Sequence, residues 1–212
     1  MTLVALASGC ASSGAPSAVV GVVVDDTCDP GIKFGSGVLV QPDLVLTSAH
    51  VLAGAAGIEV TRDGQSVPAE VVAFDPEMDL AYLKIGGLSA LPLTVSNDRI
   101  EAGDDGVAYV VRDGVVAELP VMVLRRVSIR TTDVYLEGET LRPGFELDAD
   151  IQGGDSGGAI VIDGKVAGVV WARSRRFDGR SYAIDPERAG DLIEAQLRDG
   201  EIDDDIDIDR CP

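Results

Sequence analysis

Short runs of valine, isoleucine and leucine, separated by turn sequences, fill the first part of the chain from Ala18 onward. Runs of this length that are rich in β-branched residues predict β-strands. The pair Asp63-Gly64 between two of them predicts a tight hairpin. No helical pattern interrupts the series, so we expect strand to follow strand without crossover helices. The predicted strands lie at 19–24, 37–40, 44–47, 58–61 and 70–74.

A second series of strand-like runs follows in the other half of the chain, with turn sequences at 112–114 and 163–164. Two such series predict an all-β fold of two six-stranded antiparallel barrels with a cleft between them. We expect the first barrel at about 18–95 and the second at about 103–185. The second series comprises 106–111, 120–124, 134–136, 159–162 and 166–171.

One helix is predicted after the second series. Pro186 marks its start, and Ala189, Leu192 and Ile193 follow at helical spacing. We expect a short helix at 186–199 that packs one apolar face on the second barrel. It would complete a single domain at 18–200.

Composition agrees with one enzyme-sized domain and excludes one class of partner. The chain has 212 residues, of which 46% are hydrophobic, so a substantial core can form. Its formal net charge is -19 at pH 7. A surface of this sign repels phosphate backbones, so we expect no nucleic-acid partner.

The two ends of the chain differ from this domain. Residues 1–17 hold a short apolar run, then small residues and Cys10, which resembles the end of a bacterial lipoprotein signal. We expect export. Residues 1–17 are then either a membrane tether through lipid on Cys10, the remnant of a cleaved signal, or a disordered tail. Residues 201–212 form an acidic tail that lacks the glycine turn and ordered ligand spacing of a calcium loop, so we expect no metal site there.

The other two cysteines, Cys28 and Cys211, lie near opposite ends of the domain. In an exported protein such a pair predicts a disulfide, which would attach the C-terminal tail to the first barrel. Two unrelated free thiols are the alternative.

Three residues carry the candidate chemistry. His50 is the only histidine, Ser156 stands between glycines in 153–158, and Asp79 lies between them in the chain. A serine hydroxyl becomes a nucleophile when a histidine takes its proton and a carboxylate holds that histidine in the right tautomer. The flanking glycines let the N–H groups of Gly154 and Ser156 point into one small space, which predicts an oxyanion hole.

Several segments together resemble a trypsin-like serine protease, and specifically the HtrA-type bacterial branch. The resemblance extends over about residues 18–199. It implies the chymotrypsin fold, a triad of His50, Asp79 and Ser156, a polypeptide substrate, and no metal or organic cofactor. The segments are 34–40, 44–51, 68–72, 75–81, 150–158 and 181–185.

Two departures from the family change what we expect. No PDZ module is predicted after the helix. No activation sequence stands near Val19, so we do not expect a new N-terminus to insert beside Asp155, and we expect Asp155 to pair with an arginine instead.

The resemblance also suggests where substrate binds. Asp150 occupies the position of the pocket aspartate in trypsin-like enzymes that cleave after Arg or Lys. Nearby arginines could neutralise it or invert the preference. The backbone of Val170, Trp171 and Ala172 could pair with an extended substrate as an added strand. The arginines are Arg173, Arg175, Arg176 and Arg180.

These observations predict an exported serine endopeptidase that works through an acyl-enzyme. An esterase-like hydrolase with the same residues is disfavoured, because the Gly-x-Ser-x-Gly elbow and the chain order of an α/β-hydrolase are absent. A protease-fold binding or chaperone-like protein with a latent or inactive site is the alternative from another class.

Overall fold

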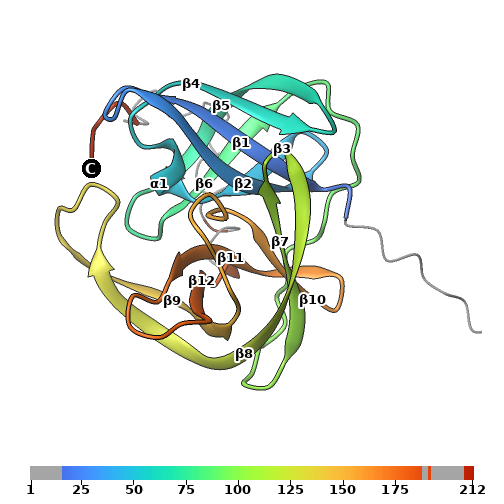
Figure 1. Cartoon of the computed structure of the whole chain (residues 1–212), viewed down its shortest axis with the longest axis vertical. Helices are drawn as coiled ribbons and strands as arrows, with labels where there is room; N and C mark the ends of the chain where they lie inside the picture. The colour runs from blue at the N-terminus through green and yellow to red at the C-terminus, as the bar shows by residue number, and fades with distance from the viewer. Residues whose placement is uncertain (1–15, 188–190, 192–207) are drawn as a thin grey trace, which may run out of the picture.

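Two closed antiparallel β-barrels, packed side by side, make up the protein in this computed structural model (Figure 1). The structure describes residues 16–187, 191 and 208–212. Each barrel has six strands, which confirms the fold class predicted from the sequence. A single helical turn, α1 (Ala49–Leu52), follows the third strand.

The first barrel contains the valine-rich run at the start of the domain. Its strands pair in the order β1-β2-β3-β6-β5-β4. Val20, Val22 and Val24 of β1 are fully buried, because alternate residues of a strand point to the same face. They join Leu39 and Leu46 in the core of this barrel. The strands are β1 (Val19–Asp26), β2 (Gly31–Gln41), β3 (Leu44–Thr47), β4 (Ala55–Arg62), β5 (Gln65–Asp75) and β6 (Leu80–Ile85).

The second barrel has the strand order β10-β11-β12-β9-β8-β7 and closes where β10 pairs with β7. Its separate core includes Val110, Phe145, Leu147 and Ile160. The strands are β7 (Asp105–Arg112), β8 (Val115–Thr132), β9 (Glu139–Asp148), β10 (Ala159–Ile162), β11 (Lys165–Arg173) and β12 (Arg180–Ile184).

Three hairpins turn on an Asp-Gly pair, at the three places where the sequence predicts turns. The pairs are Asp63-Gly64, Asp113-Gly114 and Asp163-Gly164, and all six φ angles lie between 47° and 78°. Two successive residues with positive φ match the right-handed twist of the flanking strands, and Asp and Gly tolerate that conformation. These turns set the register of β4–β5, β7–β8 and β10–β11.

One predicted strand is wrong. Residues 134–136 form a turn between β8 and β9. The carboxylate of Asp133 accepts hydrogen bonds from the N–H groups of Tyr135 (3.0 Å) and Glu137 (2.8 Å). Leu136 has a φ of 60°. An aspartate that bonds to the backbone beyond it favours a turn over a strand.

Two terminal predictions lie outside the described residues. These are Cys10 with its apolar run and most of the helix expected at 186–199. The division of the chain into 1–17, 18–200 and 201–212 stays a prediction. Within the described ranges, no helix has the length and apolar character needed to cross a bilayer.

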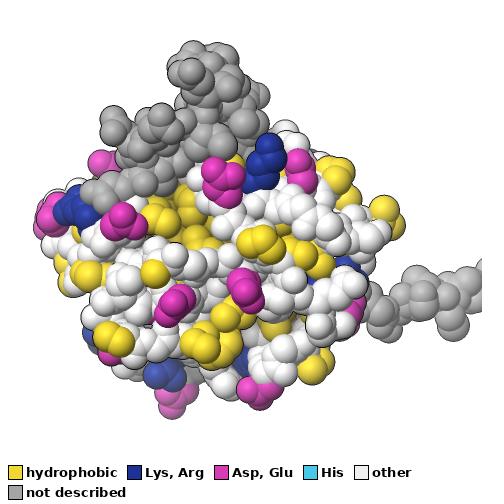
Figure 2. Space-filling view, turned by 90° about the horizontal axis from the view of Figure 1, so that it is seen from above, with side chains coloured by type: hydrophobic (Ala, Val, Ile, Leu, Met, Phe, Trp, Pro, Cys, Tyr) yellow, Lys and Arg dark blue, Asp and Glu magenta, His cyan; other side chains and the backbone are white. Residues whose placement is uncertain are grey.

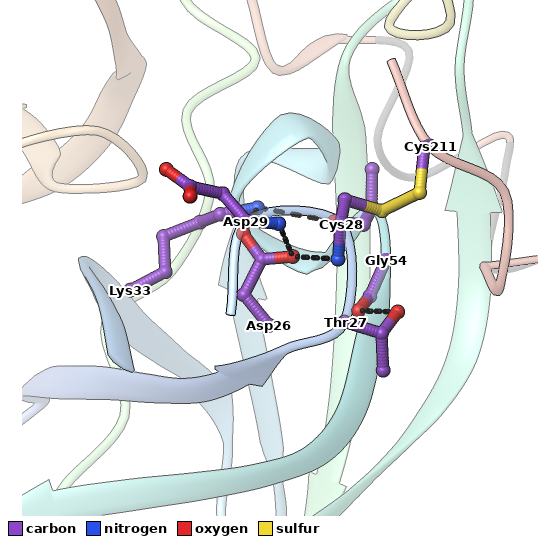
Figure 3. Close-up of a disulfide and its surroundings, with 8 residues drawn as sticks. Asp26, Thr27, Cys28, Asp29, Lys33, Gly54 and Cys211 are labelled. Atoms are coloured by element: carbon purple, nitrogen blue, oxygen red, sulfur yellow. Dashed lines mark hydrogen bonds and ion pairs between the residues drawn. A yellow bond between two sulfur atoms is a disulfide. The ribbon is translucent and has the colours of Figure 1, made fainter. Parts of the chain in front are cut away.

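The end of the chain is attached to the first barrel by a disulfide between Cys28 and Cys211 (Figure 3). Next to it, the N–H of Gly54 donates to the backbone oxygen of Ile208 at 2.7 Å. Ile208 packs against the core of the first barrel. Farther along, Arg210 forms an ion pair of 2.6 Å with Glu137 of the β8–β9 turn. The tail therefore contacts both barrels close to α1.

Acidic side chains are spread over the face of the molecule shown in Figure 2, in keeping with the formal charge of -19.

Candidate active site

His50 and Asp79 form one half of the candidate site. His50 lies in α1 directly after β3, and Asp79 directly precedes β6. Because β3 and β6 pair, with Thr47 opposite Ala81, these distant positions become neighbours. Asp79 Oδ2 lies 2.9 Å from His50 Nδ1, and Asp79 Oδ1 accepts the backbone N–H of His50 at 2.7 Å. The carboxylate thus fixes both the ring and the backbone of His50.

Asp79 is buried, with 1% of its surface exposed, and a second cation lies beside it. Arg142 of β9, itself 2% exposed, places Nη1 3.6 Å from Asp79 Oδ2. Burial raises the pKa of the Asp79 carboxyl. The attraction of His50, the hydrogen bond from its ring and the charge of Arg142 outweigh burial and hold that pKa below its usual range. Asp79 therefore stays ionised next to the imidazole.

The guanidinium of Arg142 also joins segments of both barrels. Its Nε donates to the backbone oxygen of Glu77 at 2.6 Å, and its Nη2 donates to those of Pro76 (3.2 Å) and Thr132 (3.0 Å). The same group lies 5.2 Å from the ring centroid of Trp171, a cation–π contact. One side chain thus connects the Asp79 loop, β8 and the wall of the cleft.

Ser156 lies in the β9–β10 loop of the second barrel, pressed against the first barrel. The N–H of Ser36 donates to the backbone oxygen of Ser156 at 2.8 Å. The next residue, Gly157, has a φ of +84°, and an added Cβ would lie 2.1 Å from the Ser36 oxygen and 2.3 Å from Thr47 Oγ1. Glycine is required here both for its backbone conformation and for the close approach of the barrels.

The Ser156 hydroxyl does not bond to His50 in this structure. Its Oγ lies 3.5 Å from the backbone oxygen of Trp171, the outer limit for a hydrogen bond. Among the described residues, no hydrogen bond joins Ser156 to the imidazole.

The loop before Ser156 has two backbone donors without an acceptor at the positions where the sequence predicts an oxyanion hole. Among the described residues, the backbone N–H groups of Gly154 and Ser156 donate to no protein acceptor. Gly154 has a φ of +93°, which favours glycine. Two free N–H donors two positions apart can converge on a developing negative charge.

An ion pair between an arginine and a buried carboxylate supports this loop, as expected from the missing activation sequence. Asp155 is fully buried and accepts two hydrogen bonds from Arg112, at 2.9 Å from Nε and 2.6 Å from Nη2. It also accepts the N–H of Gln152 at 2.7 Å. The hydrogen bond with Asp155 raises the pKa of Arg112. A bidentate pair on a buried carboxylate restricts the conformations of residues 152–155.

Beyond Ser156, β11 forms one wall of the site. Its pairing with β10 ends at Val169. Farther on, Ala172 pairs only with Tyr182 of β12, so within the described ranges no strand covers its other edge. That edge begins at Trp171, whose carbonyl faces Ser156. An extended peptide could pair with Trp171 and Ala172, as the sequence predicts. The prediction is wrong for Val170, because its N–H donates to Gly158 and its oxygen accepts the N–H of Gly157.

Asp150 is exposed at the other side of the loop. Its backbone oxygen accepts a 3.2 Å hydrogen bond from Arg112. Among the described residues, none of the four arginines expected to neutralise it forms an ion pair with its carboxylate, and Arg180 pairs with Glu146 at 3.7 Å instead. Whether Asp150 selects a basic side chain stays a prediction.

Sequence reasoning missed Arg142 and did not say which arginine meets Asp155. Arg112 could have been found from its place in the Arg112-Asp113-Gly114 turn, which puts it at the end of a strand. No local signal singles out Arg142, because it reaches Asp79 through the packing of the two barrels.

A His–Asp pair on one six-stranded barrel and a glycine-framed serine on the other define the class of chymotrypsin-like serine peptidases. The chain belongs to the trypsin-like peptidase domain family, whose model matches residues 35–169, and within it to the HtrA-type branch.

Similar proteins support this assignment. Serine protease Rv3671c of Mycobacterium tuberculosis is 31% identical over 140 residues, 65% of this chain and 35% of that protein. A probable periplasmic serine endoprotease, DegP-like, of Chlamydia pneumoniae is 33% identical over 178 residues, 79% of this chain and 35% of its own length. The chain thus spans about a third of the curated relatives that it matches.

Solved structures share the fold. The active form of the Rv3671c protease from M. tuberculosis superposes with a TM-score of 0.77 at 27% identity, covering 86% of this chain and 80% of that one. The HtrA-type protease AlgW with a tripeptide gives 0.75 at 29% identity, covering 88% and 62%.

Proposed function

We propose that the protein is an exported serine endopeptidase that hydrolyses peptide bonds in polypeptides. Ser156 is the nucleophile, His50 its general base and Asp79 the carboxylate that orients His50. The N–H groups of Gly154 and Ser156 hold the oxyanion. The observation that carries the proposal is the 2.9 Å contact from Asp79 Oδ2 to His50 Nδ1, which leaves Nε2 as the nitrogen to receive a proton.

The reaction follows from these positions. Ser156 Oγ bonds to the carbonyl carbon of the scissile peptide while His50 takes the hydroxyl proton. The carbonyl oxygen becomes negative and accepts hydrogen bonds from the two backbone donors. His50 then gives its proton to the leaving amine, and the C–N bond breaks. Water, deprotonated by His50, attacks the acyl ester and releases the second product and the Ser156 hydroxyl.

A fluorophosphonate tests the proposal, because it phosphonylates only a serine activated in this way. The purified protein should gain the mass of one label, and Ser156→Ala should gain none. Ser66→Ala, which removes an exposed serine on the first barrel, is the control and should label like the parent. Absence of labelling in a folded parent protein would contradict the proposal.

A second candidate function is a protease-fold binding protein with a latent site. The observation in its favour is the bond of Ser156 Oγ to the Trp171 oxygen in place of His50. This function predicts that the protein binds extended peptides although it does not react with a fluorophosphonate. A peptide that induces fluorophosphonate labelling would instead identify a peptidase that is activated by its ligand.

Export is the third part of the proposal. Two features support it, the disulfide between Cys28 and Cys211 and the periplasmic designation of the DegP-like relatives. A lipid on Cys10 stays a prediction. Intact mass of protein recovered from the cell envelope tests both points, because lipidation at Cys10 would remove residues 1–9 and add acyl mass, and a Cys10→Ala variant would lose that addition.

A further inference from the structure

An open hollow of about 520 Å³ lies beside the wall of the cleft and carries an excess of positive charge. Trp171 and Ala172 of β11 form the side nearest Ser156. Arg173, Arg175 and Arg176 form the side farther away. All three arginines are exposed.

These three arginines differ from most cations of the described residues because they have no ion-pair partner. Acids outnumber bases 36 to 17, so a cation readily finds a carboxylate. Among the described residues, every Lys and Arg belongs to an ion pair except Lys84 and the three arginines of the hollow. Arg176 lies against the ring of Phe177, 5.2 Å from its centroid, and keeps its donors free. Three unpaired guanidiniums within four positions concentrate positive charge, which attracts an anion.

Hydrogen bonds order the backbone of the turn that carries the three arginines. Ser174 donates its N–H to the backbone oxygen of Arg180 at 2.8 Å. Its hydroxyl accepts the N–H groups of Arg176 (3.2 Å) and Phe177 (3.1 Å). Arg173 itself is paired with Ser181 in the sheet. The turn is therefore ordered by hydrogen bonds, and it places the cations at the end of β11.

The direction of β11 decides which part of a substrate reaches the hollow. A peptide that adds to its free edge in antiparallel register runs opposite to β11. The scissile bond lies at Ser156, near Trp171. Residues of the peptide on the N-terminal side of that bond then lie along Ala172 and Arg173 and extend toward Arg175.

We propose that this hollow binds acidic side chains on the N-terminal side of the scissile bond, so that the protein selects polypeptides with Asp or Glu a few residues before the cleavage site. The inference rests on the proposed function for the position of the bond. Guanidinium groups bind carboxylates through two parallel hydrogen bonds. The hollow offsets the repulsion that the net charge of the protein exerts on an acidic segment, so the preference is strongest at low salt.

Cleavage of a proteome-derived peptide library, with the sites identified by mass spectrometry, measures the preference over many sequences at once. We expect Asp and Glu to be enriched about fivefold over Asn and Gln at positions three to five before the cleaved bond, since an exposed pair contributes about a factor of two to five. The enrichment should fall at 1 M NaCl. Equal frequencies in an actively cleaving protein would overturn the inference and leave the proposed function intact.

Matched charge reversals identify the residues responsible. Arg175→Glu should reduce the enrichment about fivefold or more. Lys84→Glu makes the same change of charge on β6, at the other cation that has no ion pair within the described part of the chain, and should leave the enrichment unchanged. An equal loss in both variants would assign the effect to net charge and overturn the inference.

A binding measurement separates this inference from the proposed function. Fluorescein-labelled peptides of alternating Glu and Gly, or Gln and Gly, are titrated with Ser156→Ala, which cannot acylate. The Glu peptide should bind about fivefold tighter or more in 0.05 M salt, and Arg175→Glu should remove the difference. Equal affinities would overturn the inference, whether or not the parent protein reacts with a fluorophosphonate.

Discussion

Arg142 Nη1 of the second barrel lies 3.6 Å from Asp79 Oδ2 of the first, so the buried carboxylate faces a permanent cation on one side and His50 on the other. This ion pair therefore joins the two barrels at the place where His50 is held.

Replacement of Arg142 should change both stability and the pH dependence of catalysis. Arg142→Met leaves Asp79 without its second cation and should cost about 3–5 kcal/mol in the free energy of unfolding. It should also raise the pKa of the Asp79 carboxyl, which the charge of Arg142 helps to lower, so kcat/KM should begin to fall at a higher pH on acidification. The charges of Asp75 and Asp133 also act on Arg142. Both residues remain in this variant, and their negative charges favour the same shift to higher pH.

Arg142→Lys keeps the charge but not the planar set of donors, so it separates the two effects. It should restore the pH profile and recover only part of the stability. A pH profile of Arg142→Met that superposes on the parent would show that Arg142 acts on structure alone.

Acid should weaken the native state through Asp79. Its pKa is lower in the folded protein than the ordinary 3.8, so its contribution to stability is present above that pH and is lost as pH falls toward the folded value. The free energy of unfolding of the parent minus that of Asp79→Asn should shrink on going from pH 6 to pH 3. Denaturant titrations at several pH values test this. A difference that is constant with pH would contradict it.

The ion pair of Arg112 with Asp155 should support the oxyanion loop. Arg112→Met leaves a buried carboxylate unpaired, and we expect kcat to fall by about 10²–10³-fold, the size of a lost oxyanion donor. The rate of fluorophosphonate labelling should fall in parallel. Arg130→Met breaks an exposed ion pair with Glu139 on the same barrel, and it should change neither kcat nor the rate of labelling.

Gly157→Ala should disrupt the contact between the barrels at Ser156. The new methyl group would meet the Ser36 oxygen at 2.1 Å while the backbone stays at positive φ. We expect a loss of at least about 2 kcal/mol and little fluorophosphonate reactivity. Gly153→Ala is the matched control, because its Cβ meets nothing within 4 Å and its φ is not in the positive region. Thermal unfolding of both variants decides the point.

Reduction of the disulfide should lower stability. A bond between residues separated by 183 positions constrains a long loop in the unfolded chain, and the chain-entropy model gives about 5 kcal/mol as an upper value. Cys28→Ser with Cys211→Ser should lower the urea midpoint by a corresponding amount. Without reductant, alkylation should add no mass at either position in the parent protein. A mass increase there would contradict the bond.

Local signals predicted much of the fold. The valine-rich strands and the Asp-Gly hairpins require only the preferences of neighbouring residues, and the structure confirms them. Strand β9 escaped prediction because it contains Arg142, Pro143, Gly144 and Glu146, which read as a loop. Arg142 and Glu146 are nevertheless buried, and each is held by ionic partners on other segments. The formation of this strand depends on tertiary contacts, which a short stretch of sequence does not reveal.

The candidate site shows the same division. His50, Asp79 and Ser156 stand out because a lone histidine and a glycine-framed serine are distinctive in any sequence. Arg142 and the unpaired arginines of the hollow become visible only when distances and ion pairs are known, since both depend on which carboxylates lie nearby.

The pairing of His50 with a buried carboxylate has a practical consequence, because the chain contains no other histidine. Every imidazole resonance in an NMR spectrum must come from this one ring, so no assignment by mutagenesis is needed. A downfield proton on Nδ1 would report directly on the Asp79 contact, and the ring carbons would report on what arrives at Nε2. The protein thus contains a single built-in spectroscopic probe, placed where its chemistry is proposed to occur.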